Sequence, residues 1–271
     1  MLHAVVHLIS MSSYLRQVFL RMFSRMERRR RKSLSLGSDW SYSGDLGPEN
    51  WHKNFPVAAG ENQSPINIDT HDVIYDPSLE DLKFSGYHCN GKTVNFRLRN
   101  TGYTLKVDLH GDMHMIEDGN CYEATSIVFH WGSADDRGSE HLLDQKAFPM
   151  EIQIMHKNIK YSENEDVLYK LDGIKALAVF VEVGEEEHDG LKNIINHLKN
   201  VQFAGQESDI PGFSLAFLFP NDTQKYYKYT GSLTSPPCNE CVSWTILNNP
   251  IKISAGQVRD LLFCCKNLQR Y

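Results

Sequence analysis

The chain has 271 residues, of which 41% are hydrophobic and 23% are charged, and its formal net charge is −6. This composition is typical of one large globular domain, or at most of two small ones. The negative balance gives no indication of nucleic-acid binding. No stretch approaches the roughly 20 uncharged apolar residues that a membrane-spanning helix requires. We therefore expect neither a nucleic-acid partner nor a transmembrane segment.

The basic side chains gather near the N-terminus. Residues 1–38 hold eight lysines and arginines against a single acidic residue, Glu27, so the remainder of the chain is acidic. A basic segment joined to an acidic body is typical of an appendage. We expect residues 1–38 to form a disordered basic head and residues 39–271 to form the folded domain. The head could be a mitochondrial address, a patch for nuclear import or an anionic surface, or a tail without a role.

Short alternating apolar and polar runs, bounded by turn residues, recur beyond residue 39 and predict a mostly β domain with short helices. Strands are expected at residues 93–99, 104–109, 126–131, 150–156 and 176–183. The last of these runs is nearly continuous and apolar, as in a strand that is buried on both faces. One amphipathic helix is expected within residues 190–201, where the apolar residues recur at helical spacing.

Several motifs, in the same order along the chain, resemble those of the α-carbonic anhydrase family. They are Asp39-Trp-Ser-Tyr-Ser-Gly with Gly47-Pro-Glu-Asn-Trp-His, Gln63-Ser-Pro-Ile-Asn-Ile, Phe129-His-Trp-Gly-Ser, Gly138-Ser-Glu-His, Tyr229-Thr-Gly-Ser-Leu-Thr-Ser-Pro-Pro-Cys, and Trp244. The sequence around Phe180 is similar to that of the secreted, salivary-type members. The resemblance implies an α+β single domain around a large, central, mainly antiparallel, twisted sheet of about ten strands, with a conical cavity.

The resemblance also implies a zinc ion held by three histidines, two on one strand and the third on its neighbour. Three neutral imidazoles leave tetrahedral zinc one open position for a water, whose pKa the metal lowers to about 7. Here the three positions are Val128, His130 and Gln153. Valine has no lone pair and a neutral amide suits zinc poorly. We therefore expect His130 to be the only surviving ligand position and no cofactor to bind, with zinc belonging to the alternative of an active enzyme.

Part of the family's machinery around these positions is retained. Glu151 stands where the family's glutamate supports the third histidine, and the Gln153 amide could still donate an N–H to it. Thr234 and Glu140 stand where the family orients the zinc-bound hydroxide. Without that hydroxide, we expect them to form a buried hydrogen-bonded pair that stabilises the core.

Other positions have changed or serve packing equally well. Tyr103 stands at the proton-shuttle position, and a tyrosine with a pKa near 10 cannot cycle protons efficiently at pH 7. His141 and Tyr229 are expected to share the buried network of Glu140. The residues expected at the cavity wall are Ser126, which replaces a glutamine of the family, and Leu233, Ser235 and Trp244.

The cysteines indicate where in the cell the protein is expected, and the C-terminal sequence indicates how far the predicted domain extends. Six cysteines in a chain of this length do not make a disulfide scaffold. Ala58 stands where secreted relatives carry the disulfide partner of the cysteine at position 238. We therefore expect a cytoplasmic protein, with a mitochondrial or a secreted location as alternatives. Family members continue beyond the position of Tyr271 into a further strand, so a domain truncated at its C-terminus is expected.

Three functions stay open at this point. The first is a carbonic anhydrase-related protein without hydratase activity, in which Thr234, Glu140 and Tyr103 are relic positions and an unknown protein partner is bound. The second is a zinc-dependent enzyme with weak or altered hydration of carbon dioxide to bicarbonate. The third is a truncated product without a selected function. Val128 and Gln153 favour the first, and the sequence does not indicate an oligomeric state.

Overall fold

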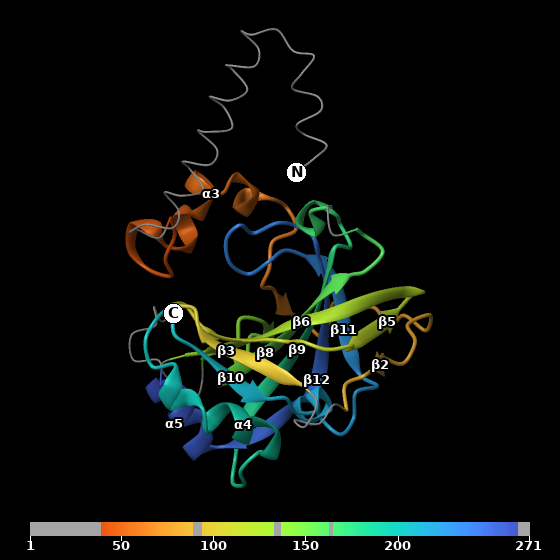
Figure 1. The fold of residues 1–271 in the computed structure, drawn as a ribbon. Helices are drawn as coiled ribbons and strands as arrows, with labels where there is room; N and C mark the ends of the chain where they lie inside the picture. The colour runs from red at the N-terminus through yellow and green to blue at the C-terminus, as the bar shows by residue number, and fades with distance from the viewer. Residues whose placement is uncertain (1–38, 89–93, 133–136, 163–164, 265–271) are drawn as a thin grey trace, which may run out of the picture. The chain divides into compact units, whose positions relative to one another are not determined.

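The computed structural model describes residues 39–88, 94–132, 137–162 and 165–264, whose arrangement is shown in Figure 1. The expected disordered head and the expectation about the C-terminus concern residues outside this described part. The chain divides into two units, residues 1–41 and residues 42–271, and the fold below is that of the second unit. Within the described residues, no helix is long and apolar enough to cross a membrane.

A ten-stranded sheet forms the centre of the domain. Its strands are β2 (Lys83–Ser85), β3 (Asn95–Asn100), β4 (Leu105–Asp108), β5 (His114–Glu117), β6 (Asn120–Trp131), β8 (Met150–Asn158), β9 (Ile174–Gly184), β10 (Glu207–Pro211), β11 (Tyr226–Gly231) and β12 (Val242–Ser254). The strand order is β10-β3-β4-β6-β8-β9-β12-β11, with β5 paired to β6 and β2 paired to β5. All neighbours are antiparallel except β9 and β12. The predicted mostly β fold around a large, mainly antiparallel sheet is confirmed.

The remaining elements are short. β1 (Asn67–Ile68) and β7 (Leu142–Leu143) form a separate parallel pair. The helices are α3 (Trp51–Asn54), α4 (Lys192–Ile195) and α5 (Ala255–Cys264), and the 3-10 turns are η2 (Gly44–Leu46), η3 (Pro48–Asn50), η4 (Pro56–Ala59), η5 (Val167–Tyr169), η6 (Asp189–Leu191), η7 (Leu198–Asn200) and η8 (Leu215–Leu218). α4 and α5 lie next to each other (Figure 1).

The prediction of a single amphipathic helix within residues 190–201 is wrong. The segment makes η6, α4 and η7 in succession, and only four of its residues are α-helical. Asparagine, histidine and β-branched isoleucine dominate residues 193–197 and have low helix propensity. Short 3-10 turns therefore replace a continuous helix. The apolar positions still serve the core, because Leu191, Ile194 and Leu198 are buried.

The sheet buries apolar side chains on both of its faces, because successive residues of a strand point to opposite sides. One cluster includes Phe129, Ile152 and Val179, and the other includes Ala178 and Trp244. The prediction that the strand at 176–183 is buried on both faces is confirmed for residues 176–181, whereas Glu182 is half-buried and Val183 is exposed. The face that carries Ala178 is the one that carries the predicted zinc positions, because Gln153 pairs with Ala178 across β8 and β9.

Candidate functional site

Strand register brings the three predicted zinc-ligand positions together. Val128 and His130 lie two residues apart on β6 and therefore share a face. On β8, Gln153 lies directly opposite Val128, and Glu151 lies opposite His130. His130, Gln153 and Glu151 are 6%, 3% and 0% exposed. The structure thus places Val128, His130 and Gln153 in the arrangement that the family resemblance implies, with different side chains.

The Gln153 amide is held between two buried carboxylates. Its Nε2 donates to Glu151 Oε1 at 2.9 Å, and this bond was expected from the sequence. The same nitrogen donates to Glu140 Oε2 at 2.8 Å, which was not expected. Since a primary amide has two N–H groups, both are engaged. The nitrogen end of Gln153 is therefore a hydrogen-bond bridge between the two carboxylates.

The Glu140 side chain contacts Gln153 on β8 and His130 on β6. Its carboxylate accepts from Gln153, and His130 Nδ1 lies 3.2 Å from its Oε1. Thr234 is half-buried in the loop after β11. Within the part of the chain that the structure describes, no hydrogen bond joins the Thr234 hydroxyl to Glu140. The buried pair expected from the sequence is not formed, because the Glu140 carboxylate turns to Gln153 and His130 instead.

Glu151 is the acceptor at the centre of this network. It accepts from the backbone N–H groups of Glu140 and His141 at 2.9 Å each, and from His141 Nδ1 at 2.8 Å. Burial by itself raises the pKa of this carboxyl. The imidazoles of His141 and His130 and the Gln153 amide outweigh burial and lower the pKa to about 2. Glu151 is therefore an ionised acceptor across the whole physiological pH range.

The network continues from His141, just before β7, to β11 and to the segment before β1. His141 Nε2 lies 2.7 Å from the Tyr229 hydroxyl, which lies 2.8 Å from Ser64 Oγ. The expected sharing of one network by His141 and Tyr229 is confirmed. Ser64 was missed as a member, although it lies in the Gln63-Ser-Pro motif. Trp244 covers the network, with its ring stacked on Tyr229 at 8° and its centroid 4.7 Å from that of His141.

The other predicted site residues lie around this network with simpler contacts. Ser126 lies on β6, on the same face as His130, and is 5% exposed. Leu233 is half-buried and packs on the apolar cluster of that face. The Ser235 carbonyl accepts a backbone hydrogen bond in the loop after β11. Tyr103 lies in the turn between β3 and β4, where its ring meets Tyr42 edge to face at 6.2 Å.

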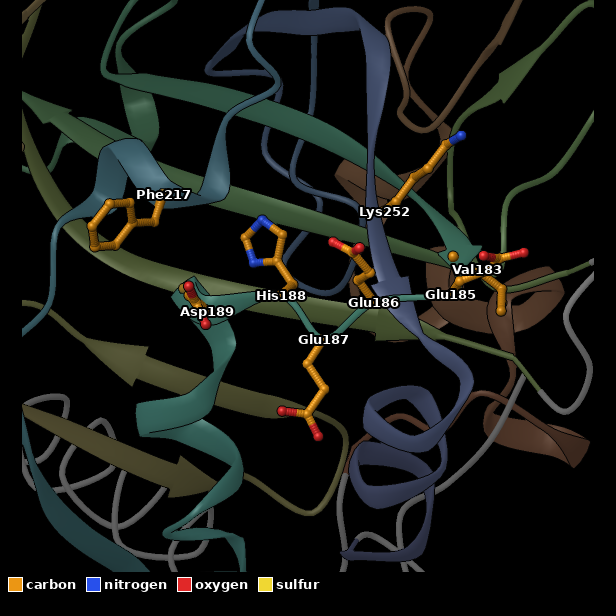
Figure 2. A pocket seen from close by; sticks show the side chains of 10 residues that line it. Val183, Glu185, Glu186, Glu187, His188, Asp189, Phe217 and Lys252 are labelled. Carbon is orange, nitrogen blue, oxygen red and sulfur yellow. The ribbon is translucent and has the colours of Figure 1, made fainter.

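A cavity of about 830 Å³ lies elsewhere, where β9 leads into η6 (Figure 2). Half of its labelled side chains are acidic, namely Glu185, Glu186, Glu187 and Asp189, and the others are His188, Phe217, Val183 and Lys252. Burial lowers the pKa of His188, which favours the neutral imidazole. None of the predicted site residues lines this hollow. The conical cavity implied by the family resemblance stays a prediction.

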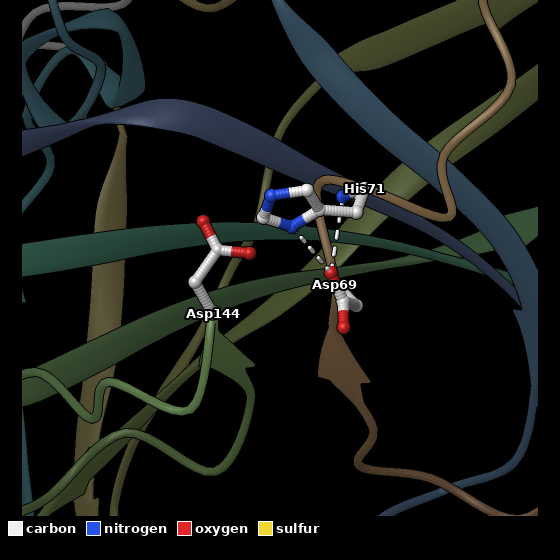
Figure 3. Close-up of side chains that lie close together, drawn as sticks. All are labelled: Asp69, His71 and Asp144. Atoms are coloured by element: carbon white, nitrogen blue, oxygen red, sulfur yellow. Dashed lines mark hydrogen bonds and ion pairs between the residues drawn. The ribbon is translucent and has the colours of Figure 1, made fainter.

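One group of three possible metal-binding side chains is present among the described residues, and it lies away from the predicted zinc positions (Figure 3). Asp69, His71 and Asp144 bring one ligand atom each within 4.8 Å of one another, and all three are exposed. Asp69 and His71 follow β1, whereas Asp144 follows β7. No sequence pattern points to this group, because only the pairing of β1 with β7 brings its members together.

Known proteins are similar in sequence to most of this chain. The family model of eukaryotic-type carbonic anhydrases matches residues 46–269. Carbonic anhydrase 12 from Homo sapiens is 39% identical over 233 residues, which are 84% of this chain and 65% of that protein. Carbonic anhydrase 6 from Homo sapiens is 39% identical over 229 residues, with coverages of 83% and 74%. Carbonic anhydrase 7 from Mus musculus is 36% identical over 240 residues, with coverages of 85% and 89%.

A domain built on this sheet, with this network on one of its faces, is of the carbonic anhydrase class. The chain belongs to the eukaryotic-type carbonic anhydrase family. It spans slightly less than two thirds of the length of carbonic anhydrase 12, and most of the length of carbonic anhydrase 7.

Proposed function

We propose that this protein holds no zinc at the family's site, does not hydrate carbon dioxide and acts as a non-catalytic binding protein. The observation that carries the proposal is the Gln153 amide, whose two N–H groups point at Glu140 and Glu151. Val128, which lies opposite Gln153, has no side-chain atom that could bind a metal. His130 is then the only imidazole of the three, and one imidazole cannot hold a zinc ion that needs at least three protein ligands.

The zinc that the family implies does not fit this donor set. A complete structural zinc site supplies an apparent binding free energy on the order of 10 kcal/mol, and most of it depends on ligands that are absent here. The reaction needs a metal-activated water at neutral pH. The hydrogen bonds of Gln153 instead support a site that stays organised without a metal, as expected for a scaffold kept for its shape. Such a scaffold would act through a bound partner.

The test is a combined metal and activity measurement on the full chain. The protein is dialysed against a chelator under native conditions, its zinc content is measured by mass spectrometry, and carbon dioxide hydration is followed by stopped flow. We expect zinc well below one equivalent and a hydration rate equal to that of buffer. One equivalent of retained zinc, together with hydration that a sulfonamide inhibits, would show an active enzyme and overturn the proposal.

A gain-of-ligand variant sharpens this test. Val128→His combined with Gln153→His restores three imidazoles on the same two strands, so we expect it to retain one zinc ion through dialysis. A matched control places the same residue types at the exposed positions, as Val57→His with Gln202→His, and should retain none. If the first variant folds but retains no zinc, lost ligands are not the reason for the missing metal.

A further inference from the structure

The ends of β1 and β7 carry a group of side chains that the zinc positions do not include. We propose that Asp69, His71 and Asp144 form a surface site for one divalent transition-metal ion of the zinc or cobalt type. The proposal goes beyond the proposed function, because the three residues lie outside the buried network and use none of its side chains. It is supported by the backbone, by the side-chain geometry and by the chemistry of the donors.

Strand pairing fixes the spacing of the two aspartates. β1 and β7 are parallel, and Asp69 and Asp144 are the residues that directly follow them. Parallel strands that end in register place the following residues at one edge. The backbone N–H of Asp144 donates to Ile68 O at 2.8 Å, and that of Thr70 donates to Asp144 Oδ1 at 2.8 Å. The two carboxylates are therefore held side by side by backbone contacts.

His71 completes the group from the turn after β1. Its Nδ1 lies 3.1 Å from Asp69 Oδ1, and the nitrogen-bearing edge of its ring faces the space between the two carboxylates (Figure 3). All three ligand atoms lie within 4.8 Å of one another. Two ligands bonded tetrahedrally to zinc at about 2.0–2.2 Å stand about 3.3–3.6 Å apart, so a closing movement of about 1–1.5 Å is enough. The side chains can make it, since those of His71 and Asp69 are 90% and 47% exposed.

The donors suit a metal ion of borderline character. The backbone N–H and the imidazole of His71 hold the pKa of Asp69 below its usual range, so this carboxyl is negatively charged at neutral pH. Asp144 Oδ1 accepts from the backbone N–H of Thr70 and shares the Thr70 hydroxyl with Oδ2, at 3.0 and 2.9 Å, so it is Oδ2 that keeps a further lone pair for a metal. One imidazole nitrogen with two carboxylate oxygens is a donor set for zinc or cobalt, whereas magnesium and calcium prefer oxygen ligands alone.

A metal at this place would tie together two strands that lead to the buried network. Ser64 lies just before β1, and His141 lies just before β7. Three protein ligands at an exposed position leave water to complete the coordination, so the ion should exchange readily. Because the unfolded chain does not hold the three residues together, binding should raise the melting temperature as the metal concentration rises.

The test is a titration of chelator-treated full chain with zinc chloride, followed by calorimetry and by native mass spectrometry. We expect one zinc ion per chain, and at least a tenfold weaker affinity in His71→Ala and in Asp144→Asn. His52→Ala removes an exposed histidine on α3, outside the group, and should leave the affinity unchanged. Cobalt should give a visible absorption band that His71→Ala abolishes, and magnesium should not compete.

Two results would overturn the site. One is an unchanged zinc affinity in both His71→Ala and Asp144→Asn, and the other is no binding at millimolar zinc. A folding defect does not obscure either result, because His71 is exposed and the melting curves without metal should match those of the unaltered chain. A second zinc ion, which remains in His71→Ala after the first is lost and disappears in His130→Ala, would contradict the proposed function and not this site. The two proposals therefore fail separately.

Discussion

At the scale of single residues, Gln153 supplies hydrogen bonds to two buried carboxylates whose charge a metal ion could otherwise offset. Glu140 and Glu151 are buried carboxylates within reach of the same position, and a cation between them would offset their charge. An amide adds no charge, but it supplies one N–H to each. His130 Nδ1 lies 3.2 Å from the other oxygen of Glu140, and His141 Nδ1 lies 2.8 Å from the Glu151 oxygen that Gln153 also contacts. A buried acidic pair can persist in this way if every oxygen keeps its donors.

The contribution of Gln153 is therefore measurable. Gln153→Leu keeps the approximate volume and removes both N–H groups, so two buried carboxylates each lose a donor. At about 1–3 kcal/mol for each carboxylate, we expect the free energy of unfolding to fall by about 2–6 kcal/mol. Urea unfolding of the variant measures this change. Gln202→Leu at an exposed position is the control, and a loss as small as that of the control would show that Gln153 does not stabilise the pair.

At the scale of elements, β9 carries a buried cation on the face opposite the candidate site. Lys175 Nζ lies 2.6 Å from Glu117 Oε2 and 3.1 Å from Ser243 Oγ. Lys228 Nζ lies 3.1 Å from the same Glu117 oxygen. Burial lowers the pKa of Lys175 to about 8, although Glu117 acts in the opposite direction. This side chain joins β9 to β5 and β12 at a cost in solvation.

The stability of the sheet should therefore depend on alkaline pH. Because the pKa of Lys175 is about 8 in the folded chain and 10.5 when unperturbed, the unfolded chain binds more protons between these values. Below pH 8, burial of the protonated lysine lowers the free energy of unfolding by about 3 kcal/mol. This cost disappears as the pH rises from 8 to 10.5, so the free energy of unfolding increases over that range. We expect Lys175→Met to remove this increase, because the variant lacks the titrating amine. Glu117 is not left unpaired in the variant, since it keeps Lys228 as its partner.

Urea unfolding between pH 7 and pH 10 checks this expectation by comparing Lys175→Met with the unaltered chain. As the pH rises, the unaltered chain should gain unfolding free energy relative to Lys175→Met. Lys199→Met at an exposed position is the control and should show no such pH dependence. Parallel profiles for the unaltered chain and Lys175→Met would show that Lys175 is not the titrating group.

The same scale shows which elements the sequence could predict. Local alternation or apolar runs predict β4, β8 and β9, and the predicted ends of these strands lie within two residues of the observed ones. β12 was missed, because Asn248-Asn-Pro interrupts its pattern and its parallel pairing with β9 is non-local. The candidate site was reached through motifs, but the bond from Gln153 to Glu140 needed the register of β6 and β8 together with side-chain geometry.

At the scale of the whole molecule, the two cysteines between β11 and β12 report on global unfolding. Cys238 and Cys241 are free, and they are 2% and 1% exposed. Burial raises the pKa of both thiols to about 11. Because the thiolate is the reactive form, both low access and a low thiolate fraction oppose modification of the folded chain. Cys121 is also free but only half-buried, so it provides an internal comparison.

Alkylation with iodoacetamide at pH 8, read by peptide mass spectrometry, tests this expectation. Cys121 should react in native buffer, whereas Cys238 and Cys241 should react together and only as urea unfolds the chain. Their labelling midpoint should then equal the midpoint of tryptophan fluorescence, since Trp244 lies on β12 beside them. Rapid labelling of Cys238 and Cys241 in native buffer would instead show that the segment between β11 and β12 opens locally. Because that segment also carries Thr234, such opening would remove one edge of the candidate site without unfolding the sheet.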